Sequence, residues 1–134
     1  MRTFVDTSAF YASFTPDDSH HHAAAQAFRR LVEEAAGLVT TNYVLLECAG
    51  LVQKRRGFSF AERFIDKTTE GMERVWVDER IQREAIALWK KAGKRELSLV
   101  DCSSFAAMRH AGIRRAFAFD PHFAAHGFEL FPSL

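Results

Sequence analysis

Short β-prone runs alternate with longer helical patterns along this sequence, and this alternation constrains the fold more than any other feature. Five runs are rich in β-branched and aromatic residues: Thr3–Val5, Leu38–Thr40, Arg74–Val77, Ala116–Phe119 and Phe128–Phe131. The stretches between them carry apolar residues at helical spacing: Ser19–Glu34, Tyr43–Lys54, Phe60–Met72, Glu79–Ala92 and Val100–His110. Strands that alternate with helices of this length favour a parallel sheet covered by helices on both faces. We therefore predict an α/β fold.

The composition limits the class of protein further. The chain has 134 residues with no Pro-, Gly- or Ser-rich linker and no internal repeat, so we expect a single domain over residues 1–134. Its net charge of +1 argues against a strongly basic nucleic-acid coat. Cys48 and Cys102 lie in apolar helical patterns without C-x-x-C spacing, which predicts buried, reduced thiols. No spanning segment or signal peptide is recognisable, so we expect a cytoplasmic protein without membrane contact.

The first predicted strand ends on a carboxylate, Asp6, and two hydroxyl residues, Thr7 and Ser8, follow at once. In an open α/β sheet, ligands bind just outside the carboxyl ends of the strands. Either hydroxyl residue can cap the next helix and so place its first N–H groups beside Asp6. Asp6 alone is equally consistent with a simple helix cap, and its interpretation depends on the other acids of the chain.

Two further acids lie on predicted helices. Glu47 falls at the border of the apolar stripe of Tyr43–Lys54, where a carboxylate needs a partner or a metal unless it is a solvated flanking residue. Asp101 falls in the first turn of Val100–His110, on the face that should pack against the sheet. Ser98 and Asp101 also have the spacing of a capping box. A capping role and a role in a site are compatible for Asp101.

Asp120 repeats the position of Asp6, because it follows the predicted strand Ala116–Phe119, although Asp-Pro is also a common turn opening. Four acids are thus directed toward one edge of the sheet: Asp6, Glu47, Asp101 and Asp120. Crowded carboxylates raise one another's pKa, and a hard divalent cation such as Mg²⁺ relieves their repulsion. One or two such ions can activate water for displacement at a phosphodiester. We therefore predict a metal-dependent phosphodiesterase site.

Four motifs carry a family resemblance: Val-Asp-Thr-Ser-Ala-Phe from Val5, Leu-Leu-Glu-Cys-Ala from Leu45, Leu-Ser-Leu-Val-Asp-Cys from Leu97 and Phe-Asp-Pro-His-Phe from Phe119. Together they resemble the PIN domain, and in particular the VapC-type toxins of bacterial and archaeal toxin–antitoxin pairs. The resemblance implies a three-layer α/β/α sandwich with a central, mostly parallel sheet. It also implies an Mg²⁺- or Mn²⁺-dependent endoribonuclease.

By motif match, the resemblance assigns the catalytic and metal-binding acids to Asp6, Glu47, Asp101 and Asp120, with Ser8 supporting Asp6. Many relatives carry Thr or Ser two residues before the last acid, where this chain has Ala118. The resemblance also implies an RNA substrate (tRNA, rRNA or mRNA), a homodimer, and a cognate antitoxin whose C-terminal segment reaches the acidic pocket. An antitoxin arginine would suit a cluster of carboxylates.

Other classes fit less well. A haloacid-dehalogenase-like phosphatase needs a second Asp where this chain has Ser8, and no G-x-G-x-x-G follows the first strand as in a dinucleotide-binding protein. The alternative that stays open is a PIN-domain scaffold that binds RNA or protein without nuclease activity. Lys94 and Arg95, which lead into the Asp101 turn, are the best candidates for contacts with RNA phosphates, although basic pairs at helix ends are commonly just solvated.

Three remaining features receive structural interpretations. The run His20-His21-His22 has no Cys or His at ligand spacing, so we expect a polar helix start near the mouth of the site and not a zinc site. Trp76 and Trp89 lie in a predicted strand and a predicted helix, and both are expected in the core. The apolar face of Phe60–Met72 is expected to be core, or a groove for a dimer mate or an inhibitory helix.

Overall fold

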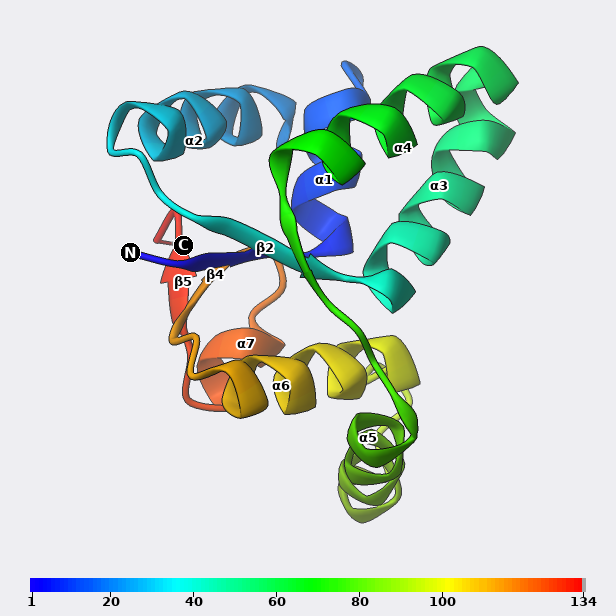
Figure 1. The fold of residues 1–134 in the computed structure, drawn as a ribbon, viewed down its shortest axis with the longest axis vertical. Helices are drawn as coiled ribbons and strands as arrows, with labels where there is room; N and C mark the ends of the chain where they lie inside the picture. Colours follow the sequence, from blue (N-terminus) through cyan, green and yellow to red (C-terminus); the bar gives the residue numbers. More distant parts are fainter. Residues whose placement is uncertain (134) are drawn as a thin grey trace.

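A five-stranded parallel sheet forms the centre of the computed structural model, which describes residues 1–133 (Figure 1). The strands in chain order are β1 (Thr3–Val5), β2 (Leu38–Thr41), β3 (Glu73–Val75), β4 (Arg115–Phe117) and β5 (Glu129–Phe131). Their order across the sheet is β3-β2-β1-β4-β5, and every neighbouring pair is parallel. The chain therefore winds outward from β1 on one side and returns to it through β4, which makes the β1–β4 boundary the topological switch point.

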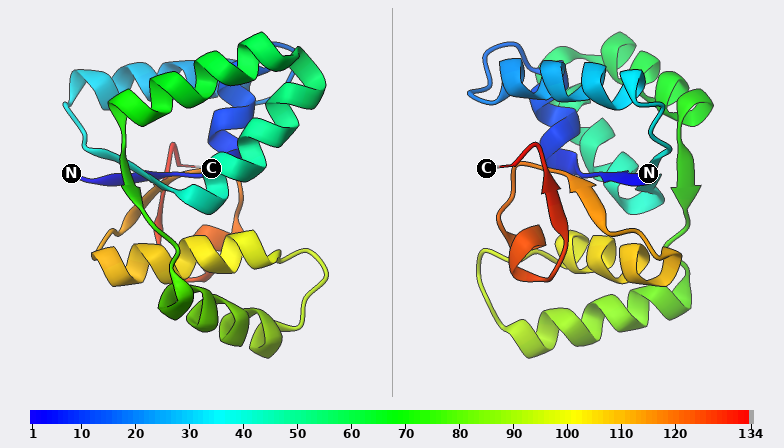
Figure 2. Two further views of the ribbon diagram at one scale, coloured as in Figure 1. Left: turned by 45° about the vertical axis from the view of Figure 1, so that its right-hand side comes forward. Right: turned by 90° about the vertical axis from the view of Figure 1, so that its left-hand side faces the viewer.

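Helices cover both faces of the sheet, as predicted (Figures 1 and 2). On one face lie α1 (Thr7–Phe14), α2 (His21–Glu33), α3 (Asn42–Arg56) and α4 (Phe58–Gly71). On the other lie α5 (Glu79–Ala92), α6 (Leu99–Ala111) and the short α7 (His122–Ala125). Helix α6 lies next to the sheet, and α5 packs against the outer side of α6 (Figure 1). The three-layer α/β/α sandwich is confirmed.

The inner strands are buried on both faces of the sheet, and more than half of their side chains are apolar. Five of their side chains have no exposed surface: Phe4, Val5, Val39, Ala116 and Phe117. Such continuous burial is typical of a parallel sheet between two helical layers. Cys48 and Cys102 are buried free thiols, as predicted. Among residues 1–133, the helices lack the combination of length and apolar character that crossing a membrane requires.

Two differences from the predicted elements affect the site. Helix α1 is capped by Asp6, whose side chain accepts a hydrogen bond from the Ser8 N–H, which is the alternative that the sequence left open, and not by Thr7 or Ser8. An Asp directly before the first helical turn satisfies a backbone donor that would otherwise have no partner. Strand β4 ends at Phe117, two residues earlier than predicted, so a short segment leads from it to Asp120.

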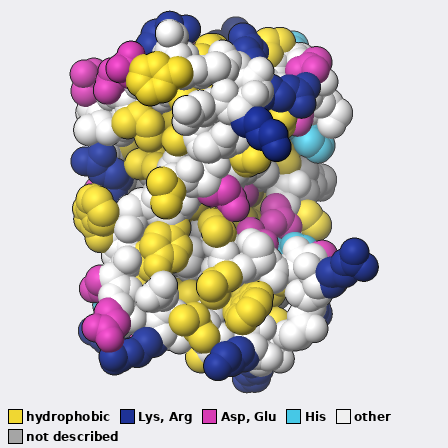
Figure 3. Space-filling view, turned by 90° about the vertical axis from the view of Figure 1, so that its right-hand side faces the viewer, with side chains coloured by type: hydrophobic (Ala, Val, Ile, Leu, Met, Phe, Trp, Pro, Cys, Tyr) yellow, Lys and Arg dark blue, Asp and Glu magenta, His cyan; other side chains and the backbone are white. Residues whose placement is uncertain are grey.

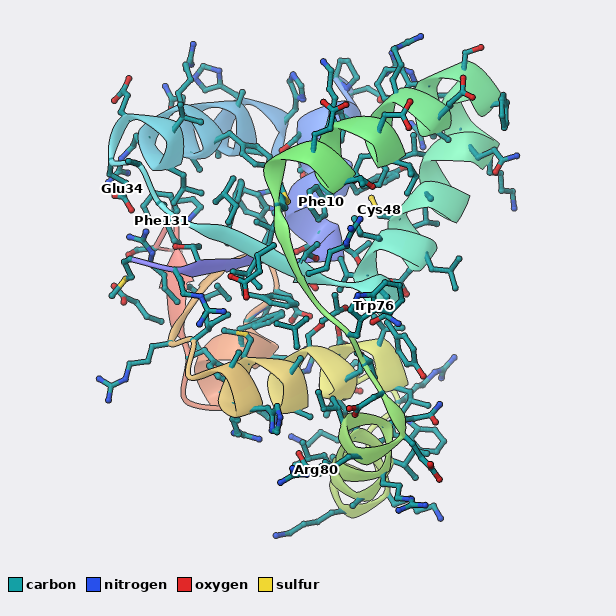
Figure 4. All side chains as sticks on the ribbon, viewed as in Figure 1. Phe10, Glu34, Cys48, Trp76, Arg80 and Phe131 are labelled. Atoms are coloured by element: carbon teal, nitrogen blue, oxygen red, sulfur yellow. The ribbon has the colours of Figure 1, made fainter. Side chains whose placement is uncertain are left out.

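The prediction that both tryptophans lie in the core is wrong. Trp76 follows the edge strand β3 and is 64% exposed, and Trp89 is 42% exposed (Figure 4 labels Trp76). The helical period directs Ile81 and Ala85 of α5 into the contact with α6 and leaves Trp89, in the last turn, at its border. A pattern of apolar spacing identifies the buried face of a helix but not where its neighbour ends.

The apolar face predicted within Phe60–Met72 is core. Phe64 is buried and forms edge-to-face ring contacts with Phe10 and Phe14, at centroid distances of 5.2 and 5.3 Å. Phe60 and Ile65 are partly buried against the same cluster. This packing fixes α4 on α1, the helix that begins at Asp6.

Candidate active site

Acidic side chains gather near the middle of the face on which the strands end (Figure 3). Asp6 directly follows β1, and Asp120 comes three residues after β4. Because β1 and β4 are neighbours in the sheet, these two acids lie on either side of the switch point. Asp101, in the first turn of α6, approaches the same place from the helical layer below. The structure thus places three of the four predicted acids at one edge of the sheet.

Asp6 is 4% exposed and is held by its neighbour Ser8. Its Oδ2 accepts hydrogen bonds from the Ser8 hydroxyl at 2.6 Å and from the Ser8 N–H at 3.1 Å. The same hydroxyl oxygen accepts a hydrogen bond from the Phe119 N–H at 3.0 Å. Ser8 therefore joins the end of β1 to the segment that carries Asp120, and it supports both acids.

The charge state of Asp6 reflects its surroundings. Burial raises its pKa to about 6, the two hydrogen bonds from Ser8 oppose this rise, and the charges of Asp101 and Asp120 add to it. Without a cation, ionisation of Asp6 at neutral pH therefore costs the folded protein free energy. Because Asp101 and Asp120 raise the pKa of Asp6, and Asp120 raises that of Asp101, the three carboxylates lie close enough to interact electrostatically.

Asp101 combines a structural task with a place in the cluster. It forms the capping box with Ser98 that the sequence predicts: its Oδ2 accepts the Ser98 N–H at 3.0 Å, and its own N–H donates to the Ser98 hydroxyl at 3.0 Å. Partial burial raises its pKa, the Ser98 N–H lowers it, and the charge of Asp120 raises it. The cap leaves Oδ1 for another partner.

Asp120 is held by His122, a residue that the sequence analysis did not single out. The Asp120 Oδ1 accepts the His122 N–H at 2.9 Å and lies 2.8 Å from the ring nitrogen Nδ1 of His122. The signal was present as Asp-Pro-His, since an Asp readily bonds the backbone two residues onward. Ala118 offers no hydroxyl to this segment, which contacts from Ser8 and His122 hold in place.

Glu47 lies apart from these three acids. It is exposed on α3, next to the buried Cys48. Burial raises the pKa of the Cys48 thiol to about 12, and the charges of Glu47 and Asp6 add to that rise. Asp6 and Glu47 thus both lie close enough to Cys48 to act on its thiol. Within the described residues, the charge of Glu47 is not among those that shift the pKa of Asp6.

The donor chemistry of the site suits a hard divalent cation. Asp6, Asp101 and Asp120 each use one carboxylate oxygen in hydrogen bonds, and over residues 1–133 the other oxygen of each accepts none from the protein. Free carboxylate oxygens are the ligands that Mg²⁺ and Mn²⁺ prefer. In the part of the chain that the structure describes, no three His, Cys, Asp or Glu side chains already stand close enough to hold an ion. Binding would therefore require the carboxylates to turn toward a common point.

The histidine run forms the start of α2, as predicted, and it lies beside the cluster. The His20 ring stacks on Phe119, the residue before Asp120, with centroids 4.6 Å apart. The His21 ring nitrogen Nδ1 lies 2.8 Å from the Ala12 carbonyl oxygen. These contacts fix the start of α2 against α1 and the Asp120 segment.

Two basic runs of the sequence, Lys54-Arg55-Arg56 and Arg114-Arg115, each contain an arginine that forms an ion pair within the protein. Arg55 forms an ion pair with Asp17 at 2.7 Å. Arg115 is buried and forms an ion pair with Glu34. Lys94 and Arg95 are instead exposed in the connection between α5 and α6, which keeps them available to a ligand.

Comparison with known proteins agrees with this architecture. The PIN domain profile matches residues 3–129, and the chain belongs to the PIN-domain family. The 23S rRNA-specific endonuclease VapC20 of Mycobacterium tuberculosis is 34% identical over 128 residues, which cover 93% of this chain and 94% of that protein. The crystal structure of the same toxin, described as cleaving the sarcin-ricin loop, matches with a TM-score of 0.82 at 33% identity over 94% of this chain and 95% of its own.

More distant structures share the fold alone. VapBC2 from Rickettsia felis, bound to a promoter DNA fragment, matches with a TM-score of 0.68 at 11% identity, covering 97% of each chain. FitAcB from Neisseria gonorrhoeae matches with a TM-score of 0.64 at 15% identity, covering 96% of each chain. The sheet order and helical layers described above are thus retained where little sequence identity is left.

Proposed function

We propose that this protein is an Mg²⁺- or Mn²⁺-dependent endoribonuclease of the VapC kind and that its substrate is ribosomal RNA. The observation that carries the proposal is the convergence of Asp6, Asp101 and Asp120, each with one free oxygen, at the switch point of the sheet. The activity named for VapC20, which is 34% identical, supports rRNA as the substrate. A scaffold without nuclease activity would leave these unpaired carboxylate oxygens without a ligand.

The three converging acids would hold the cation, and Glu47, exposed on α3, would have to turn toward them to act as the fourth acid of the site. When bound, the ion supplies Lewis-acid activation of a water molecule and of the scissile phosphate. Ser8 holds the Asp6 Oδ2, so that the second oxygen of Asp6 is left for the cation. Since the ligands must be ionised, a cation would favour the charged form of Asp6 that burial disfavours.

His122 gives the site a group that can hold a proton. Its Nδ1 lies 2.8 Å from the Asp120 Oδ1, and the same oxygen accepts its N–H, so the ring has a fixed orientation. An imidazole fixed in this way can take the proton of an attacking water or give one to a leaving oxygen. In this scheme hydrolysis proceeds without a covalent intermediate.

We also propose a cognate antitoxin and a homodimer as protein partners, together with a single domain in a cytoplasmic setting. An apolar cavity of about 530 Å³ lies between α3, α4 and the end of β3, and Leu46 and Trp76 at its edge are 76% and 64% exposed. Exposed apolar residues grouped in this way suit a protein interface. The mass of the protein in solution, alone and with the product of an adjoining small gene, tests both partners.

The test of the enzymatic proposal is cleavage of purified 23S rRNA and of a tRNA pool by the wild-type protein with Mg²⁺ or Mn²⁺. Discrete rRNA cuts that disappear with EDTA and with Asp6→Asn are expected. Asp66→Asn, which changes an exposed acid of α4, is the matched control and should cleave like the wild type. Folded protein that binds Mn²⁺ but cuts neither RNA would contradict the nuclease, and cuts in tRNA alone would contradict the substrate.

A further inference from the structure

An exposed aromatic ring lies among cations outside the acidic cluster. Trp89, in the last turn of α5, is 42% exposed. It lines a surface cavity of about 430 Å³ together with Lys90, Lys94 and Arg95. A flat apolar ring surrounded by positive charges is suited to a ligand that is itself flat and anionic.

The local sequence explains why these residues meet. Gly93 ends α5 in the left-handed conformation, at φ 55°, which most side chains would resist. The chain then turns, the Leu97 N–H donates to the Lys94 carbonyl at 3.4 Å, and the buried Leu97 anchors the loop. This turn brings Lys94 and Arg95 back beside the ring of Trp89.

The positive charge of this cavity is not neutralised by the protein. On the preceding turns of α5, Arg80 and Arg83 form ion pairs with glutamates four residues away. In contrast, no carboxylate among residues 1–133 lies within ion-pair distance of Lys90, Lys94 or Arg95. Unpaired cations around a cavity attract phosphate groups.

Lys94 lies between this cavity and the surroundings of the acidic site. The same side chain lines a second cavity, of about 360 Å³, together with His122 and His126. His122 in turn contacts Asp120. Burial lowers the pKa of His126, and the charges of Arg109, His122 and Lys94 lower it further, so Lys94 acts on this second cavity electrostatically as well. A path therefore leads from Asp120 past His122 and Lys94 to Trp89.

We propose that Trp89, Lys90, Lys94 and Arg95 form a subsite for single-stranded RNA, in which one unpaired base stacks on Trp89 and the flanking phosphates contact the three cations. The proposal rests on the proposed function, since it supposes an RNA strand that extends from the acidic site. An exposed ring selects an unpaired base because the faces of paired bases are stacked within a duplex. A protein partner is less suited, because the exposed apolar residues gather around Trp76 and not around Trp89.

The direct test is the fluorescence of Trp89 in a Trp76→Phe protein, where it is the single tryptophan. The ligand is an uncleavable 2′-O-methyl octanucleotide of mixed sequence, without added metal. Binding should quench the emission, and a duplex of the same sequence should quench it much less. Quenching by the duplex to the same degree would contradict stacking on an unpaired base.

Affinities of variants are then measured by anisotropy of the labelled octanucleotide. Trp89→Ala should weaken binding about tenfold, while Trp89→Phe should retain most of it. Lys94→Gln should reduce the slope of log affinity against log salt by about 0.7, as expected for one lost phosphate contact to a single strand. Trp76→Ala, at the other exposed tryptophan, is the matched control and should bind normally. In rRNA cleavage, the larger share of the Trp89→Ala loss should appear in KM.

The outcomes separate this proposal from the proposed function. Wild-type cleavage of rRNA combined with unchanged affinity, salt slope and KM in Trp89→Ala and Lys94→Gln would overturn the subsite and leave the nuclease standing. Quenching and the expected variant effects in a protein that cleaves no RNA would support the subsite and overturn the nuclease. A change in molecular mass caused by Trp89→Ala, with RNA affinity unchanged, would assign the ring to a protein interface instead.

Discussion

The two ends of the central sheet treat buried charge in opposite ways. At the amino end of β4, Arg115 is buried, its Nε donates to the Thr3 hydroxyl at 2.9 Å, and its guanidinium forms an ion pair with Glu34. Figure 4 shows Glu34 at this end of the sheet, away from Cys48, which lies near the acids of the other end. At the carboxyl end, Asp6 is just as buried, but its charged neighbours are two further acids.

The difference indicates which end is built for stability and which for a ligand. A buried guanidinium that has both an ion pair with a surface glutamate and a hydrogen bond to a buried hydroxyl has its partners in the isolated protein. A set of carboxylates that raise one another's pKa is complete only when a cation joins them. Substitutions at the two ends should therefore have opposite effects on the free energy of unfolding.

Asp6→Asn should have the largest effect, a loss of rRNA cleavage of 100-fold or more by the scale of roughly 10² for essential catalytic groups. It should also stabilise the metal-free protein, because the Asp6 pKa is raised from 3.8 to about 6 in the folded state. Ionisation of Asp6 lowers the free energy of unfolding of the wild type. This loss is absent while Asp6 is protonated, grows as pH rises from about 4 to about 6, and is complete above that, on the order of 3 kcal/mol. Urea unfolding with EDTA across this range measures it. Lower stability of the variant at neutral pH would make Asp6 a structural residue.

Arg115→Met should act in the opposite sense. Removal of the guanidinium leaves the buried Thr3 hydroxyl without its partner, so the free energy of unfolding should fall by on the order of 2 kcal/mol, while the loss of the exposed Glu34 as a partner should add little. The rate of cleavage per folded molecule should stay the same. Arg114→Met, at the exposed neighbouring position, is the control and should change stability by less than about 0.5 kcal/mol. Equal effects of both substitutions would remove the contrast between the two ends.

Ser8→Ala tests the link between β1 and the Asp120 segment. It removes the hydroxyl that donates to Asp6 and accepts from the Phe119 N–H, so cleavage should fall about tenfold. The pKa of Asp6 should rise further, because the hydrogen bonds of Ser8 lower it. The rising limb of activity against pH should then move to higher pH. Ser13→Ala, which removes another hydroxyl of α1, should leave this limb in place.

Glu34→Gln should have the smallest effect and a distinct pH dependence. The hydrogen bond from Arg115 lowers the pKa of Glu34 below its ordinary value, so the ionised form favours folding. That contribution is present above the ordinary pKa of the acid and is lost as pH falls through the lowered one. The variant should therefore be slightly less stable at neutral pH and equal to the wild type in strong acid. A difference in stability between the variant and the wild type that persists in strong acid would mean that the substitution acts through packing and not through charge.

The sequence predicts the layers and the position of most acids for simple reasons. Strand–helix alternation requires a parallel sheet, and the carboxyl ends of such strands meet at one edge. The positions of Asp6 and Asp120 follow from that rule, and the position of Asp101 follows from its capping box, which is a local pattern. Each of these inferences needs only the order of residues and the geometry of one element.

Other features depend on contacts between distant residues and were not predictable. Arg115 resembles a surface cation in the sequence because its partner Glu34 lies 81 positions earlier. The Ser8 hydroxyl meets the Phe119 N–H across 111 positions. Trp89 has the spacing of a buried helical residue, but it is 42% exposed in the last turn of α5. Such contacts become visible only when the sheet order is known.

The order in which the acids occur along the chain bears on when activity can arise during synthesis. Asp120 comes last and is carried by the segment after β4, the strand that completes the surroundings of β1. A nascent chain that extends only through α6 already contains Asp6, Glu47 and Asp101 but lacks one neighbour of its central strand. Under the proposed function, the ribosome that makes this protein would not meet a complete acidic site on an unfinished chain. Cleavage would begin only after the part of the chain that closes the sheet has been made.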